Sequence, residues 1–251
     1  YGPPGGPENP ASDERYIEIW NLVFMQYDQQ SDGEQIPLPR PSIDTGAGLE
    51  RVLSVMQNVD AVWELDEFQT LLEVAEAITG VAKDSANSTV VSLQILVDHA
   101  RSSSFLISDG VIPSNEDRGY VLRRIVRRAV RHAYLLGVEK PIMSELADAV
   151  ITLMDDAYPD LAENKSLIKE SLQREEEGFR RTLSAGMKIL EGHLSEVKEN
   201  ESLSGEVAFQ LHDTYGFPME LTQEIAAERK IAINLEQFND AMALQRAVSY
   251  T

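Results

Sequence analysis

Hydrophobic positions repeat with two different periods along the chain, and the change of period divides it into two parts. Residues 15–27 are rich in β-branched and aromatic side chains, which predicts a strand. Alternation places Ile19, Asn21, Val23 and Met25 on one face. Both faces are mostly apolar, as in a central strand covered on both sides. Residues 28–33 predict a turn, and residues 42–45 predict a return strand that makes the pair antiparallel.

Beyond residue 49 every long segment has the helical period. The pattern predicts helices over 47–59, 66–80, 89–107, 118–136, 142–156, 160–199, 205–214, 218–229 and 235–249. We expect the dense charges of the longest helix to form a solvated face. The periods together predict an α+β protein, in which a sheet-bearing part over residues 1–62 precedes a larger all-helical domain over residues 63–251.

Composition narrows the class of protein. The 251 residues are 43% hydrophobic and carry a net charge of −20, which disfavours indiscriminate adhesion to nucleic acid. The absence of cysteine excludes disulfides and thiolate metal sites, and with four scattered histidines we expect no metal site. No apolar run approaches the roughly 20 residues needed to span a bilayer. We therefore expect a soluble, cytoplasmic protein with no membrane partner. The turn-rich start without Met suggests a piece of a longer protein.

Candidate binding chemistry gathers where the strands give way to the helices. Within eight residues the chain carries the carboxylate of Asp44, the side-chain-free positions Gly46 and Gly48, and the guanidinium of Arg51. These groups suit a ligand with an ammonium, a flat base and a phosphate. Gly-x-Gly at such a bend is also ordinary turn chemistry, so the spacing alone leaves both interpretations open.

A second concentration of charge lies in the predicted helix over 118–136. Its six arginines are Arg118, Arg123, Arg124, Arg127, Arg128 and Arg131. Helical geometry places the last five opposite the apolar side, as a basic ridge. A phosphate backbone is one possible partner. An internal network of ion pairs is the other, because 42 acidic residues are available, and charge alone does not decide.

Four segments resemble one family. Residues 46–51, Gly-Ala-Gly-Leu-Glu-Arg, resemble motif 3 of class II aminoacyl-tRNA synthetases. Residues 18–26, residues 112–116 with 118–124, and residues 212–218, His-Asp-Thr-Tyr-Gly-Phe-Pro, resemble the alanyl-tRNA synthetase branch of that class. The resemblance implies an ATP-dependent ligase of alanine and tRNA(Ala). It further implies that residues 1–62 are the C-terminal part of the class II antiparallel sheet, followed by a helical domain that recognises the tRNA acceptor stem.

The resemblance also implies roles at the bend. Asp44 would hold the amino group of alanine, Asn21 and Val23 would surround its methyl group, and Gly46 and Gly48 would lie against the ligand. Arg51 would act catalytically on the γ-phosphate of ATP, which arrives with Mg²⁺. Motifs 1 and 2 are not found in this chain, so we expect it to need the remainder of the synthetase chain for activity. The family's zinc belongs to an editing domain that we do not expect here.

In the helical domain the resemblance implies contacts with tRNA. Asn115 and Asp213 would read the G·U pair of the acceptor stem, and the six arginines would contact its backbone. Asn115 is also a possible helix cap, and Asp213 a possible cap of the turn after it. Asp117 adds negative charge where RNA would approach. We expect His132, His193 and His212 at the surface or in caps.

Overall fold

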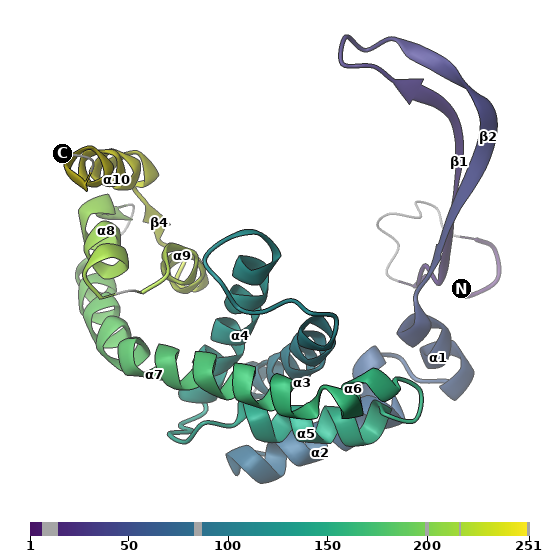
Figure 1. Ribbon diagram of the computed structural model, residues 1–251, viewed down its shortest axis with the longest axis horizontal. Coiled ribbons are helices and arrows are strands. Elements are labelled where there is room, and N and C mark those ends of the chain that lie inside the picture. Colours follow the sequence, from purple (N-terminus) through teal and green to yellow (C-terminus); the bar gives the residue numbers. More distant parts are fainter. Residues whose placement is uncertain (7–14, 83–86, 199–200, 216, 250–251) are drawn as a thin grey trace. The chain divides into compact units, whose positions relative to one another are not determined.

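The computed structural model describes residues 1–6, 15–82, 87–198, 201–215 and 217–249 (Figure 1). Helices dominate, and an antiparallel strand pair and two very short strands accompany them, which confirms the predicted α+β class. The chain separates into two compact units, Tyr1–Thr70 and Leu71–Thr251. Whether these correspond to functional domains divided near residue 62 stays a prediction.

The first unit contains an antiparallel hairpin. Strand β1, Trp20–Gln29, pairs with β2, Gln35–Ala47, from Trp20 opposite Ala47 to Gln29 opposite Gln35. The ladder shifts register between Met25 and Tyr27. Strand β2 begins earlier than expected because its prolines do not interrupt it, and proline is tolerated in strands that have a free edge.

The expectation that β1 is covered on both faces is wrong. Every residue of β1 is exposed, including Trp20 at 63% and Phe24 at 66% of their reference area. Among the described residues this sheet has only two strands, and no other element buries the side chains on either of its faces. Apolar composition therefore identified the strand correctly but not its environment.

Helix α1, Leu49–Gln57, follows the hairpin directly. It starts after Gly48 and stops at Asn58, whose left-handed backbone (φ 56°) closes the last turn through its N–H. The short 3₁₀ helix η1, Val62–Glu64, leads to α2, Asp66–Thr79. The rings of Trp63 and Phe68 stack edge to face with centroids 5.0 Å apart. Helix α2 crosses the boundary between the two units, which falls after Thr70.

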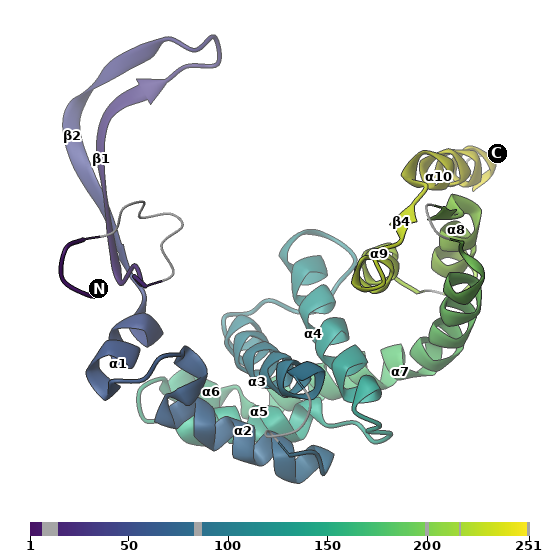
Figure 2. The same ribbon diagram turned by 180° about the vertical axis from the view of Figure 1, so that it is seen from behind.

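Four long helices form the main body of the second unit. They are α3, Asn87–Ser108; α4, Asp117–Leu135; α5, Met143–Met154; and α7, Lys165–Glu196. Figures 1 and 2 show α7 as a long curved helix that passes α5 and α4 and ends near α8. The buried core includes Leu96, Leu122, Ile151 and Leu172. The apolar stripe of each helix faces this core, as its period predicted.

The predicted single helix over 160–199 is two helices. Pro159 opens α6, Pro159–Glu163, and α7 begins at Lys165. Asn164 stands between them, and its Nδ2 donates to the carbonyl of Ser108 at 3.4 Å. The tertiary contact with α3 thus fixes the break at a position where the sequence has no proline.

Three helices complete the chain: α8, Gly205–Asp213; α9, Met219–Glu228; and α10, Leu235–Ser249. Ala208, Met219 and Phe238 bury a small core between them. Two parallel strands, β3 (Ser202–Leu203) and β4 (Ala232–Ile233), were not predicted. Gly216 of the His-Asp-Thr-Tyr-Gly-Phe-Pro segment lies outside the described residues. No helix in the described ranges has the length and apolarity needed to cross a membrane.

Candidate functional site

The hairpin register brings four of the predicted ligand residues together. Asn21 lies opposite Gly46, and Val23 lies opposite Asp44. Residues directly opposite in an antiparallel pair project to the same face, so the amide, the small apolar side chain and the carboxylate share one face with the bare backbone of Gly46. All four residues are exposed. The site is therefore an open face of the ribbon.

Arg51 follows this face along the chain, in the first turn of α1. The N–H of Gly48 donates to the Ile19 carbonyl at 3.2 Å, which joins the helix start to the strand. A Cβ at position 48 would lie 3.2 Å from Cδ of Arg51, so the missing side chain makes room for the arginine stem. Nη1 of Arg51 donates to the Glu18 carbonyl at 2.9 Å. Its guanidinium stays exposed and forms no ion pair with a described residue.

Glu18 links the two halves of this face, a role that strand alternation did not indicate. Its carbonyl accepts from Arg51, and its Oε1 accepts a long 3.5 Å hydrogen bond from Nδ2 of Asn21. The chemical result is a carboxylate, an amide and a guanidinium around side-chain-free backbone. Such a set can bind a small zwitterion beside a phosphate.

The loop before α4 presents Asn115 on a tightly built support. Ser114 donates and accepts within this loop. Its Oγ donates to the Glu116 carbonyl at 2.9 Å and accepts from the Glu116 N–H at 3.4 Å, and its own N–H donates to the Gly119 carbonyl at 3.2 Å. A Cβ at Gly119 would meet Ser114 Oγ at 2.2 Å, so only glycine permits this approach. Asp117 adopts a left-handed φ of 50°. The N-cap of α4 is Glu116, so Asn115 does not serve as the cap.

Two arginines of α4 share one carboxylate on α7. Nε of Arg123 and Nε of Arg127 donate to the same Oε1 of Glu175, at 3.0 and 2.7 Å. The Glu175 side chain is only 12% exposed. Nη1 of Arg123 also donates to Oδ1 of Asn115. The side chain of Asn115 is thus tied to α4 and α7 rather than free.

Helix α9 offers three glutamates, each one turn from the next, to α4. Glu220 accepts from the hydroxyl of Tyr120, and Glu224 accepts from Nε of Arg128 at 2.9 Å. Glu228 receives both terminal nitrogens of Arg131, at 2.9 and 2.6 Å. Burial, and secondarily the hydrogen bond to Glu220, raise the pKa of Tyr120. These three contacts form what we call the α9 carboxylate ladder.

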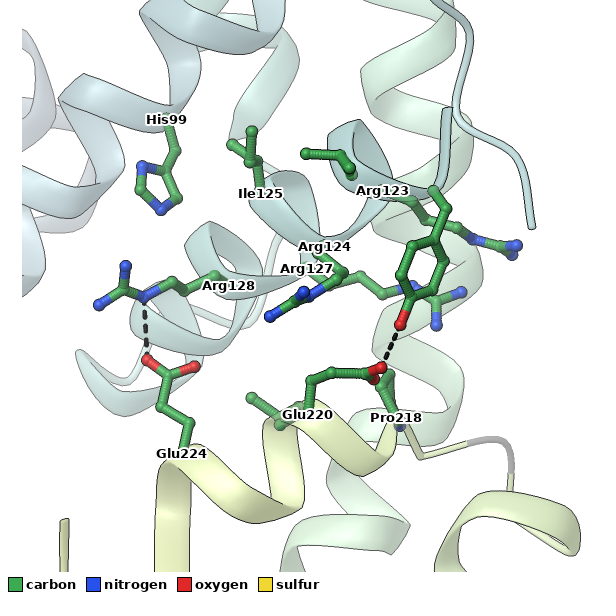
Figure 3. Close-up of a pocket in the computed structure, with 12 residues that line it drawn as sticks. His99, Arg123, Arg124, Ile125, Arg127, Arg128, Pro218, Glu220 and Glu224 are labelled. Atoms are coloured by element: carbon green, nitrogen blue, oxygen red, sulfur yellow. Dashed lines mark hydrogen bonds and ion pairs between the residues drawn. The ribbon is translucent and has the colours of Figure 1, made fainter. Parts of the chain in front are cut away.

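A cavity of about 360 Å³ lies between α4 and α9, beside the Glu220 and Glu224 contacts of the ladder (Figure 3). Arg124, Ile125 and Leu221 line it, with His99 at one side. Figure 3 shows Arg124 between the Arg128–Glu224 pair and Glu220. Arg124 lies 6.0 Å from the Tyr120 ring centroid and, like the exposed Arg118, forms no ion pair in the described part of the chain. These two arginines remain available to an external anion.

The prediction that the last five arginines form an exposed basic ridge is wrong for Arg131. Arg131 is only 1% exposed and belongs to the interior, although it is the most C-terminal member of the set. Arg123, Arg127 and Arg128 also have internal carboxylate partners. The network of ion pairs that charge alone left open is thus present for four of the six arginines, and RNA contact by any of them stays a prediction.

The expected solvated face of the long helix is also wrong at two positions. Glu175 holds the two arginines, and Glu176 is fully buried. The carboxylate of Glu176 accepts from the N–H groups of Ile142 and Met143 at the start of α5, and from Arg180. It therefore caps one helix from another. Regular spacing of Glu220, Glu224 and Glu228 was a sequence signal for the ladder, but nothing local marked Glu175 or Glu176.

Asp213 and His132 complete the predicted positions. Asp213 ends α8 at the surface, and its Oδ1 accepts from Nε2 of Gln245 at 2.8 Å, so its side chain is engaged by α10. His132 is buried, contrary to expectation, and Nδ1 lies 3.0 Å from Oγ of Ser92. Burial, followed by the nearby charge of Arg131, lowers the pKa of His132 to about 4.

Comparison with known proteins gives consistent results over nearly the whole chain. The family model described as tRNA synthetases class II (A) matches residues 2–251. The alanine–tRNA ligase of Idiomarina loihiensis is 52% identical over 245 residues, 98% of this chain and 28% of that protein. That of Chelativorans sp. (strain BNC1) is 51% identical over 246 residues, 98% of this chain and 27% of the relative. The chain thus spans a little over a quarter of the length of these relatives.

Proposed function

The chain belongs to the family of class II (A) tRNA synthetases, and on this basis we propose that it supplies substrate-binding residues of an alanine–tRNA ligase. The reaction would join alanine to ATP as alanyl-adenylate and then transfer alanine to the 3′ end of tRNA(Ala). The observation that carries this proposal is the shared face of the hairpin. There Val23 opposes Asp44, Asn21 opposes Gly46, and Arg51 follows at the start of α1.

Each group on this face has a task in the proposed reaction. The Asp44 carboxylate pairs with the ammonium of alanine, while Asn21 and Val23 border its methyl group. The bare backbone of Gly46 and Gly48 allows the nucleotide to lie close. Arg51 binds the γ-phosphate, and its hydrogen bond to the Glu18 carbonyl orients the guanidinium toward the ligand. Catalysis then rests on positioning and charge stabilisation.

Mg²⁺ belongs to the proposal as the ion that accompanies ATP and neutralises its phosphates when bound. Within the described ranges no group of three or more His, Asp or Glu side chains is arranged to hold a metal. Glu18, whose Oε1 accepts from Asn21, and Asp44, which lies opposite Val23, supply carboxylate oxygens to the proposed site. Their exposed carboxylates suit a hard cation that keeps most of its ligands from phosphate and water.

The helical unit would contact the acceptor stem of tRNA(Ala). Arg118 and Arg124, which have no internal carboxylate partner among the described residues, are the best-supported contacts to phosphate. Asn115 and Asp213 would read base edges, since short amide and carboxylate groups at the surface can reach them. Contacts by Arg123, Arg127, Arg128 and Arg131 would require RNA to compete with glutamates.

Alanine-dependent exchange of pyrophosphate into ATP tests the catalytic part, measured in the complete synthetase chain that also supplies motifs 1 and 2. Arg51→Ala should lower this rate by about 10²- to 10³-fold, as does removal of a charge-stabilising donor elsewhere. Asp44→Asn should act mainly by raising the KM for alanine. Arg40→Ala is the matched control, because Arg40 is also an exposed arginine of the hairpin. Its rate should stay near that of the unmodified protein.

Two results would overturn the assignment. Exchange that is unchanged in Arg51→Ala would remove this arginine from the reaction. No ATP binding, together with binding of an acceptor-stem minihelix that depends on Arg118 and Arg124, would instead indicate a non-catalytic RNA-binding module.

A further inference from the structure

An arginine connects a largely buried carboxylate to an exposed amide. Glu175 on α7 accepts from Arg123 and Arg127, and the same Arg123 reaches Asn115 in the loop before α4. The three residues come from separate segments of the second unit. They form a chain of contacts that runs from a site 12% exposed to a side chain at the surface.

The chemistry of these groups allows only one orientation of the amide. A guanidinium has hydrogen-bond donors and no acceptor, so it can engage the Oδ1 of Asn115 but not its Nδ2. The oxygen is therefore held inward and the NH₂ group is left outward. An exposed asparagine without such a partner would rotate between two orientations that exchange donor and acceptor.

Glu175 keeps the arginine in place. Its Oε1 takes Nε of Arg123, which leaves Nη1 for Asn115 and prevents the fork from swinging toward solvent. Arg127 binds the same oxygen one helical turn further along, so both arginines are engaged by this carboxylate, with 26% and 21% of their side chains exposed. A carboxylate that is mostly buried needs such partners, which makes this arrangement the stable one.

We propose that Glu175 and Arg123 are positioning residues that orient the Asn115 amide with its NH₂ group outward and so set discrimination between base pairs in bound RNA. This inference rests on the proposed function, in which Asn115 reads a base edge. Withholding Arg123 and Arg127 from phosphate also lowers affinity that is independent of sequence. Loss of the Glu175 charge should then change affinity and discrimination in opposite directions.

The test uses binding of two acceptor-stem RNA minihelices that differ only in the G·U pair, which one carries and the other replaces by G·C. Glu175→Gln should lower the ratio of the two affinities about tenfold, the size expected for loss of one good base contact. Affinity for the G·C minihelix should stay equal or rise. The slope of log affinity against log salt should steepen by about one to two, because each of the two freed arginines can add about one phosphate contact.

Three variants make the test specific. Glu170→Gln, an exposed glutamate on the same helix, should change neither quantity. Arg123→Lys keeps the charge but not the fork, and should lose discrimination while it retains affinity. In an Asn115→Ala background, Glu175→Gln should have no further effect on the affinity ratio, because the group that it positions is gone.

The outcomes separate this inference from the proposed function. If Asn115→Ala loses discrimination but Glu175→Gln and Arg123→Lys retain it, the positioning role is wrong and the proposed function stands. If Asn115→Ala itself retains discrimination, the proposed reading by Asn115 fails. Should Glu175→Gln not fold, as circular dichroism would show, Arg123→Lys alone decides the positioning role.

Discussion

Arginines of the hairpin region and of the arginine-rich helix α4 differ in their exposure and in their partners. Arg51, at the end of the hairpin, is exposed and touches only a backbone carbonyl through its guanidinium. Arg131, on α4, is 1% exposed and grips both oxygens of Glu228. A charged residue is available to a ligand only where the fold has not already given it a partner. Residue type alone therefore identified the chemistry of both regions but not its availability.

The largest expected effect is a loss of free energy of unfolding when the buried Glu176 is replaced. Glu176→Ala would leave the N–H groups of Ile142 and Met143 without their acceptor and Arg180 without its carboxylate. Removing one partner of such a buried pair costs about 3–5 kcal/mol in free energy of unfolding. Urea denaturation measures it, with Glu170→Ala as a surface control. A loss below about 1 kcal/mol would mean that the cap contributes little.

Acid should weaken the helical unit through His132. The pKa of this histidine is lowered from 6.5 to about 4, so the unfolded chain binds the proton more readily than the folded one. The free energy of unfolding should therefore fall as the pH drops from about 6.5 toward 4, by at most about 3 kcal/mol. Denaturation at several pH values tests this. The slope should flatten in His132→Phe and persist in His193→Gln, and an equal slope in both variants would contradict it.

A smaller effect, on RNA affinity, is expected at the α9 carboxylate ladder, where one substitution would leave an arginine of α4 without its partner, as Arg51 is at the hairpin. Glu224→Gln would release Arg128 beside Arg124. One additional phosphate contact should raise affinity for an acceptor-stem minihelix by about three- to tenfold at low salt and steepen the salt dependence by about one. Fluorescence anisotropy measures both. Glu236→Gln removes an equal charge from exposed α10 and serves as the control, because a rise in both variants would reflect net charge alone.

The smallest effect belongs to the hairpin itself. Phe24→Ala removes a ring that is 66% exposed, so stability should change by no more than about 0.5 kcal/mol. The same truncation at Phe179, which is 2% exposed, should cost about 3–5 kcal/mol. Thermal unfolding compares them. A large loss at Phe24 would show that the ribbon face is buried in solution.

Hydrophobic period was sufficient for most of the secondary structure. Alternation over residues 15–27 located β1, and a 3.6-residue repeat located each long helix of the second unit. Period could not find the break at Asn164, which depends on a contact with Ser108 in α3. It also missed β3 and β4, because two-residue strands are too short to show alternation.

The candidate site shows the same division. Asn21 and Val23 could be placed on one face because strand alternation fixes direction, whereas the position of Asp44 opposite Val23 comes from the hairpin register alone. The partners of Arg123 and Arg131 could not be named, because Glu175 and Glu228 are 52 and 97 residues distant along the chain. Such pairings depend on how helices pack.

The register shift between Met25 and Tyr27 gives the hairpin unequal tolerance of changes in length. Deleting Leu22 would turn either Asn21 or Val23 to the reverse side of the ribbon, since side chains alternate strictly along a strand. Insertions near Gly33, at the far tip, would leave the paired segment near α1 untouched. Loop grafts or affinity tags therefore belong at that tip.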